Sequence, residues 1–119
     1  MREGRLCRRE DYQRVMGLGK SVSDKNLVLK VAAGCGIKSR VGIVTSKKVG
    51  GAVDRNLIKR RLKAIFQQVS LQNGWDVVVI ARHAACEVPF IELKASVLKQ
   101  IGRIGILDTE NEKDGAVVN

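Results

Sequence analysis

Residues 52–69 read AVDRNLIKRRLKAIFQQV, a segment in which apolar residues recur with the period of an α-helix. On a helix that turns by about 100° per residue, one narrow stripe collects the apolar side chains Ile58, Leu62, Ile65 and Val69. The opposite side collects the polar side chains Asn56, Lys59, Arg60 and Lys63. The segment therefore predicts an amphipathic helix that packs on a sheet with its apolar side and presents cations to solvent.

The cationic side of this predicted helix lacks internal counter-charges. No acidic residue follows Asp54 on the helix, and like charges at helical spacing destabilise an isolated helix by roughly 0.2–0.5 kcal/mol per pair. Lys47 and Lys48 precede the helix, and Gly50-Gly51 leaves backbone N–H groups at its positive end open to a phosphate. We therefore favour a polyanion-binding face over the simpler alternative, a solvated basic face.

Weaker patterns predict the remaining elements. A helix is expected at 8–17, and the branched segment LVLKVAA at 27–33 is expected to be a strand that forms a hairpin with RVGIVTS at 40–46. The run DVVVIAR at 76–82 is typical of a strand buried on both faces. A second long amphipathic helix is expected after Pro89, which suits the first turn of a helix.

Length and charge indicate one basic domain with an acidic end. A chain of 119 residues suits a single core, and with 3% aromatic residues that core must be mostly aliphatic. The net charge is +10, but residues 1–107 carry 21 basic and eight acidic residues, a net charge of +13. Such an excess attracts polyanions, and RNA, DNA or an anionic membrane surface would all satisfy it. We expect a folded domain over 1–105 and a disordered acidic tail over 106–119.

Several other classes of protein are disfavoured. Three cysteines without C-x-x-C spacing suit neither a disulfide framework nor a zinc site, although His83 and Cys86 form an isolated H-x-x-C. The GKS at 19–21 lacks the first glycine of a phosphate-binding loop, so no nucleotide cofactor is expected. His83 has no neighbouring acid in sequence to support general-base catalysis. Because no apolar run approaches the roughly 20 residues that span a bilayer, we expect a cytoplasmic protein without a membrane partner.

The segment TSKKVGGAVDRNLIKRRLKAIF at 45–66 resembles the signature of the bacterial ribonuclease P protein family. That signature has a strand ending in Ser-Lys-Lys, a glycine turn and a helix beginning Arg-Asn-Arg, and the resemblance extends over residues 5–103 in segment order. It implies an α+β fold, a two-layer α/β sandwich in the order αβββαβα. The implied four-stranded sheet has a left-handed βαβ crossover and resembles the second domain of a small-subunit ribosomal protein.

The resemblance also implies a function. Family members assist a catalytic RNA that removes the 5′ leader from precursor tRNA by Mg²⁺-dependent hydrolysis, so no catalytic residue and no protein-bound cofactor are expected. Carried over to this sequence, the residues that bind the RNA subunit are Lys47, Lys48, Arg55, Asn56, Lys59, Arg60, Arg61 and Lys63. The residues of a cleft for the single-stranded leader are Tyr12, Met16, Val28, Lys30, Arg82 and His83.

This sequence departs from the family pattern at three positions. Leu57 replaces the second arginine of Arg-Asn-Arg, which predicts one phosphate contact fewer, and Met16 and Lys30 stand where many relatives carry aromatic residues. Tyr12 and Met16 could also be a core-facing pair, and Lys30 could mark an exposed sheet edge. The alternative function is that of a structural RNA-binding protein of ribosomal type with no role in cleavage.

Overall fold

A computed structural model describes residues 6, 8–34, 36 and 38–106 of the chain. Its elements follow in the order α1 (Arg9–Leu18), β1 (Lys20–Ser23), β2 (Leu27–Ala33), β3 (Arg40–Val44), α2 (Ala52–Gln68), β4 (Trp75–Ala81), the short 3-10 helix η1 (His83–Cys86) and α3 (Phe90–Ile104). Apart from the single turn of η1, this is the αβββαβα order that the resemblance implies. None of the helices in these ranges is long and apolar enough to span a bilayer.

The sheet corrects one prediction from the sequence. Its strand order is β1-β2-β4-β3, so β2 pairs with β1 and β4, and the predicted hairpin between residues 27–33 and 40–46 is wrong. The strand β4, which is buried on both faces, takes a central position, and β3 pairs with it in parallel through the α2 crossover. The hairpin partner of β2 is the short polar strand β1, for which the residues gave no strand signal.

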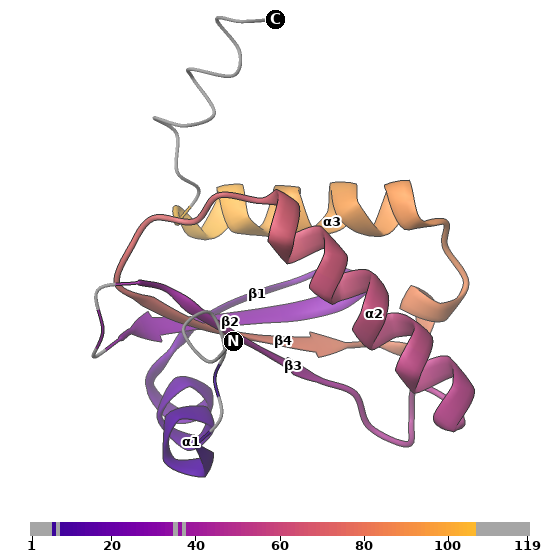
Figure 1. Ribbon diagram of the computed structural model, residues 1–119, viewed down its shortest axis with the longest axis horizontal. Coiled ribbons are helices and arrows are strands. Elements are labelled where there is room, and N and C mark those ends of the chain that lie inside the picture. The colour runs from indigo at the N-terminus through magenta and orange to yellow at the C-terminus, as the bar shows by residue number, and fades with distance from the viewer. Residues whose placement is uncertain (1–5, 7, 35, 37, 107–119) are drawn as a thin grey trace, which may run out of the picture.

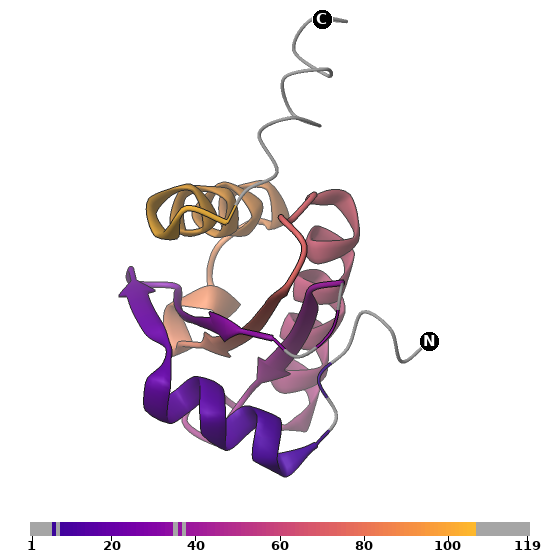
Figure 2. The same cartoon turned by 90° about the vertical axis from the view of Figure 1, so that its left-hand side faces the viewer.

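The helices cover the two faces of this sheet unequally. Figures 1 and 2 show α2 and α3 together on one face and α1 on the other. The larger core lies under α2 and α3 and includes Leu29, Val77 and Val79 from the strands. The neighbouring strand residues Val78 and Ile80 point the opposite way and pack with Val15 of α1. The α+β sandwich is thus confirmed, and α1 adds a partial cover to its second face.

The apolar stripe predicted for α2 is confirmed. Ile58, Leu62 and Ile65 are fully buried in the larger core, and Val69, just past the helix, is half-buried against it. Burial of one such side chain contributes roughly 1.5–3 kcal/mol. These residues therefore fix the rotation of α2 about its own axis and, with it, the direction of the opposite, polar side.

The folded domain extends one residue beyond its predicted end. Gly105 terminates α3 in the left-handed conformation, with φ of 85°, and returns the chain toward the core. Ile106 is then 1% exposed, and its carbonyl accepts a hydrogen bond from the backbone N–H of Gln72 at 2.8 Å. Ile106 therefore belongs to the domain, whereas the rest of the predicted acidic tail, residues 107–119, lies outside the described residues.

A buried glycine on β3 makes room for Tyr12. A Cβ atom added to Gly42 would lie 2.4 Å from the Tyr12 hydroxyl oxygen and 2.7 Å from a ring carbon. The same hydroxyl donates a hydrogen bond to the carbonyl of Leu6 at 3.3 Å. The absence of a side chain at residue 42 therefore determines how closely α1 approaches the sheet.

We predict that Gly42→Ala lowers the free energy of unfolding by about 1–3 kcal/mol, because the new methyl group overlaps the Tyr12 ring. The matched control is Gly102→Ala on α3, where an added Cβ meets nothing within 4 Å. That change should raise the free energy of unfolding by about 0.5–1 kcal/mol through the higher helix propensity of alanine. Urea unfolding measures both, and equal stabilities of the two variants would contradict this account of Gly42.

Candidate nucleic-acid interface

The polar side of α2 carries a group of exposed cations. Its side chains Asn56, Lys59, Arg60 and Lys63 are all exposed, as the helical spacing predicted. Lys47 and Lys48, in the loop before the helix, are exposed as well, and Arg55 in the first turn is half-buried. We call these seven residues the α2 basic face, and they present six positive charges to solvent.

Arg61 lies apart from the α2 basic face, although it was predicted to be one of its members. The side chain is half-buried, and its Nη1 donates a hydrogen bond of 3.0 Å to the carbonyl of Val88. This contact ties α2 to the turn that leads into α3. Arg61 therefore contributes a structural contact in the isolated protein. Leu57, the residue that departs from the family pattern, is half-buried on the margin of the same helix.

His83 and Cys86, the two residues of the H-x-x-C pattern, hold the loop before α2. The Nδ1 atom of His83 lies 3.0 Å from the carbonyl oxygen of Val49, and the Cys86 thiol donates to the same oxygen at 3.3 Å. Burial raises the pKa of the Cys86 thiol, and the nearby Asp54 carboxylate raises it further. Both side chains thus fasten the loop before α2, and His83, which was predicted to line the leader cleft, contacts this loop and is not among the residues that share the α1 side of the sheet.

The predicted cleft residues of α1 and β2 share the face of the sheet that α1 partly covers. In the strand register, Val28 is opposite Ile80 and Lys30 is opposite Val78, and all four side chains point to this side. Val28, Lys30 and Ile80 are half-buried, Tyr12 on α1 is half-buried, and Met16 is 44% exposed. Met16 is therefore not a core residue, and the alternative of a core-facing pair applies only to Tyr12, which packs with Val78.

Two further residues belong to the floor of this surface. Val44 on β3 is opposite Ile80 on β4, and both are half-buried beside Tyr12. The sequence alone did not identify them because their position depends on the parallel pairing of β3 with β4. We call the surface formed by Tyr12, Met16, Val28, Lys30, Val44, Ile80 and Arg82 the α1 groove, after the leader cleft that the family resemblance implies.

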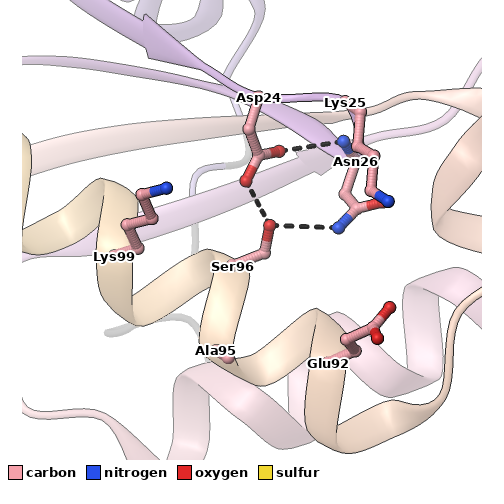
Figure 3. A pocket seen from close by; sticks show the side chains of 7 residues that line it. All are labelled: Asp24, Lys25, Asn26, Glu92, Ala95, Ser96 and Lys99. Carbon is pink, nitrogen blue, oxygen red and sulfur yellow. Dashed lines mark hydrogen bonds between the residues drawn. The ribbon is translucent and has the colours of Figure 1, made fainter.

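Arg82 at the end of β4 is fixed by the turn between β1 and β2. Its backbone N–H donates to the carbonyl of Asn26 at 2.9 Å, and its Nη1 donates to the carbonyl of Asp24 at 3.2 Å. The turn itself is anchored on α3, because the Asp24 carboxylate accepts hydrogen bonds from the Ser96 hydroxyl and from the backbone N–H of Asn26 (Figure 3). Burial alone would raise the pKa of Asp24, but these hydrogen bonds outweigh it and lower the pKa.

An open hollow of about 370 Å³ lies between this turn and α3 (Figure 3). Its charged lining residues are two acids, Asp24 and Glu92, and two lysines, Lys25 and Lys99. The four charges cancel, so the hollow offers no net attraction to a polyanion. We therefore leave this hollow out of the candidate interface, which consists of the α2 basic face and the α1 groove.

An ion cluster around the buried Asp76 fastens α1 to the sheet. Asp76, at the start of β4, is 1% exposed and pairs with Arg14 of α1 and with Arg40 of β3, whose Nη2 lies 2.7 Å from the Asp76 carboxylate. Asp11 of α1 pairs with both arginines, at 3.4 Å from Arg14 and 3.3 Å from Arg40. Burial would raise the pKa of Asp76, but hydrogen bonds from Arg40 and Arg14 lower it overall.

Comparisons with known proteins agree with this fold. The family model described as Ribonuclease P matches residues 1–105. The chain belongs to the ribonuclease P protein family. A ribonuclease P protein component from Dehalococcoides mccartyi is 42% identical over 109 residues, which cover 92% of this chain and 91% of the relative.

Solved structures of ribonuclease P proteins have the same fold. The Staphylococcus aureus protein has a TM-score of 0.79 and 27% identity, covering 88% of this chain and 98% of that one. The Thermotoga maritima protein has a TM-score of 0.74 and 31% identity, covering 84% and 96%. Family membership makes the chain an RNA-binding accessory subunit of ribonuclease P, a ribonucleoprotein endonuclease of tRNA processing.

We predict that acid destabilises the folded domain through Asp76. Since its folded pKa is lowered relative to the unfolded chain, its contribution is complete above the unfolded value of about 4 and is lost as the pH falls through the folded value. The free energy of unfolding should therefore decline as the pH falls below ~4. In Asp76→Asn this decline should be shallower, whereas Glu10→Gln, at an exposed position on α1, should retain the wild-type profile. Identical profiles for wild type and Asp76→Asn would contradict the role given to this carboxylate.

Proposed function

We propose that the α2 basic face holds the RNA subunit of ribonuclease P and that the α1 groove holds the single-stranded 5′ leader of precursor tRNA. The observation that carries the proposal is the separation of the two surfaces. The α2 basic face lies on the helix that covers one face of the sheet, and the α1 groove is formed on the other face. One protein can therefore contact two RNA segments at the same time.

The α2 basic face suits a folded RNA. Six cations project from one helix and the loop before it, and they have no acid among them except Asp54 at the helix start. The first turn of α2 has no side-chain cap, so its N–H groups add to the positive potential. Such a surface binds phosphates and releases counterions, which gives affinity without base recognition.

The α1 groove suits a flexible single strand. Half-buried Val28, Val44 and Ile80 form an apolar floor, and Tyr12 offers one aromatic ring for stacking. Lys30 lies beside this floor and Arg82 at the end of β4, where both can reach phosphates. Stacking of one base on an aromatic side chain contributes roughly 1–3 kcal/mol. With one ring instead of several, the groove relies on charge more than the family pattern does.

In this proposal the RNA subunit catalyses the hydrolysis that removes the leader, and the same RNA binds the Mg²⁺ ions of the holoenzyme. Among the described residues there is no group of three or more His, Cys, Asp or Glu side chains that could ligate a metal ion. We also propose that leader removal takes place in the cytoplasm. Family membership disfavours the alternative of a ribosomal-type structural protein.

We predict that the triple change Lys59→Gln, Arg60→Gln and Lys63→Gln weakens binding of the RNA subunit and flattens its salt dependence. The slope of log K against log salt should decrease by up to roughly 0.9 for each phosphate that the variant no longer neutralises. The matched control removes three exposed cations elsewhere, Lys20, Lys99 and Arg103. Since both variants lose the same charge, an equal decrease of slope in both would show that only net charge matters and would contradict the α2 basic face.

We predict that Tyr12→Ala combined with Lys30→Ala reduces the preference of the reconstituted holoenzyme for precursor tRNA over mature tRNA. Removal of one stacking ring and one charge should lower the ratio of the two affinities about tenfold or more. Affinity for mature tRNA, which has no leader, should not change. An unchanged ratio in this variant would refute leader binding in the α1 groove.

A further inference from the structure

We propose that the ion cluster of Asp76, Arg14, Arg40 and Asp11 positions α1 so that Tyr12 and Met16 face the groove, and that Arg14 and Arg40 are positioning residues for leader recognition. This inference rests on the proposed function of the α1 groove. It assigns a role to four residues that did not figure in either predicted site, and it connects the stability of the fold with the geometry of one RNA-binding surface.

The cluster and the groove residues lie on opposite flanks of α1. At about 100° per residue, Val15 faces the sheet, Asp11 and Arg14 fall on one side of it, and Tyr12 and Met16 fall on the other. Val15 is fully buried, and Arg14 reaches Asp76, as this placement requires. The first flank is therefore fastened to the sheet, while the second borders the groove.

The contacts of the cluster restrain rotation of α1 about its axis. Arg14 donates to the Asp76 carboxylate on β4 and to the carbonyl of Ala33 at the end of β2, so one guanidinium spans two strands. Arg40 holds the same carboxylate from β3, with its Nε at 3.0 Å from one oxygen and its Nη2 at 2.7 Å from the other. Bidentate geometry of this kind fixes direction as well as distance.

The surrounding chain is shaped around this carboxylate. A Cβ atom at Gly34 would lie 2.9 Å from Oδ1 of Asp76, so the chain after β2 passes too close for most side chains. A buried carboxylate without its partners would be strongly destabilising, which favours the paired arrangement over any other orientation of α1. With α1 in this orientation, the Tyr12 ring lies close to Gly42 and its hydroxyl donates a hydrogen bond to the carbonyl of Leu6.

The cluster is suited to positioning rather than to direct binding of RNA. Its two arginines and two carboxylates sum to no net charge, and Asp76 is almost fully buried. Phosphates are therefore attracted to Lys30 and Arg82 and not to Arg14 or Arg40. A substitution in the cluster should therefore change the affinity for the leader only by shifting the position of α1.

The test compares Arg14→Gln with Arg9→Gln in the holoenzyme reconstituted with the catalytic RNA. Both changes remove one positive charge from α1, but Arg9 is exposed and has no part in the cluster. Arg14→Gln should lower the ratio of precursor to mature tRNA affinity at least threefold, and Arg9→Gln should leave the ratio unchanged. Affinity for the RNA subunit should stay at the wild-type value in both, because α2 packs on the other face of the sheet.

A second variant separates positioning from a general decrease of stability. Arg40 lies on β3 and can influence α1 only through the two carboxylates, so Arg40→Gln should lower the same ratio, and the double variant should add little to either single change. Arg14→Lys, which retains a charge, should restore part of the ratio. A decrease of RNA-subunit affinity in parallel with the ratio would overturn the inference, since a merely structural role predicts that result.

The inference and the proposed function fail in different ways. If Tyr12→Ala with Lys30→Ala lowers the ratio but Arg14→Gln and Arg40→Gln do not, the groove binds the leader and the cluster has no positioning role. If none of these variants changes the ratio, the groove itself does not bind the leader, and both are wrong.

Discussion

The burial of one stripe of α2 in the core is the contact on which the other features depend. With Ile58, Leu62 and Ile65 fully buried, α2 cannot rotate without exposing them to water. The same constraint directs Lys59, Arg60 and Lys63 to solvent. The same helix connects β3 to β4, which pair in parallel, so one packing arrangement holds this crossover and sets the direction of the α2 basic face.

Apart from Arg82, which donates to the Asp24 carbonyl and also belongs to the α1 groove, the arginines that hold elements together lie outside the two proposed RNA-binding surfaces. Arg14, Arg40 and Arg61 are engaged by carboxylates or a backbone carbonyl, and they hold elements together. Within the described ranges the exposed cations of α2 have no ion pair or hydrogen bond of this kind, and in the proposed function they bind the phosphates of RNA. Because desolvated arginines prefer planar, bidentate partners while phosphate attraction needs accessible charge, the two groups are divided between the interior edge of the sheet and the outer side of α2.

Periodic patterns in the sequence predicted what depends on local spacing, and failed where long-range pairing decides. The stripe and the cations of α2 follow from helical period alone. The predicted hairpin between residues 27–33 and 40–46 was wrong. Two apolar strands joined by a short glycine-containing segment have the same local sequence pattern whether they pair with each other or, as here, with other strands. The ion cluster was not predicted, since Arg14 and Asp76 are 62 residues apart and neither carries a local signal. Likewise, the fit of Tyr12 over Gly42 needs the register of α1 on the sheet.

The most direct test of the account is a footprint of lysine amines with a small acylating reagent, read by mass spectrometry with and without the catalytic RNA. The account predicts that RNA protects Lys59 and Lys63 on α2 strongly, while Lys20 and Lys99, which are exposed outside α2, remain as reactive as in the free protein. Protection of Lys20 and Lys99 with Lys59 and Lys63 still reactive would contradict the central claim that α2 carries the RNA subunit.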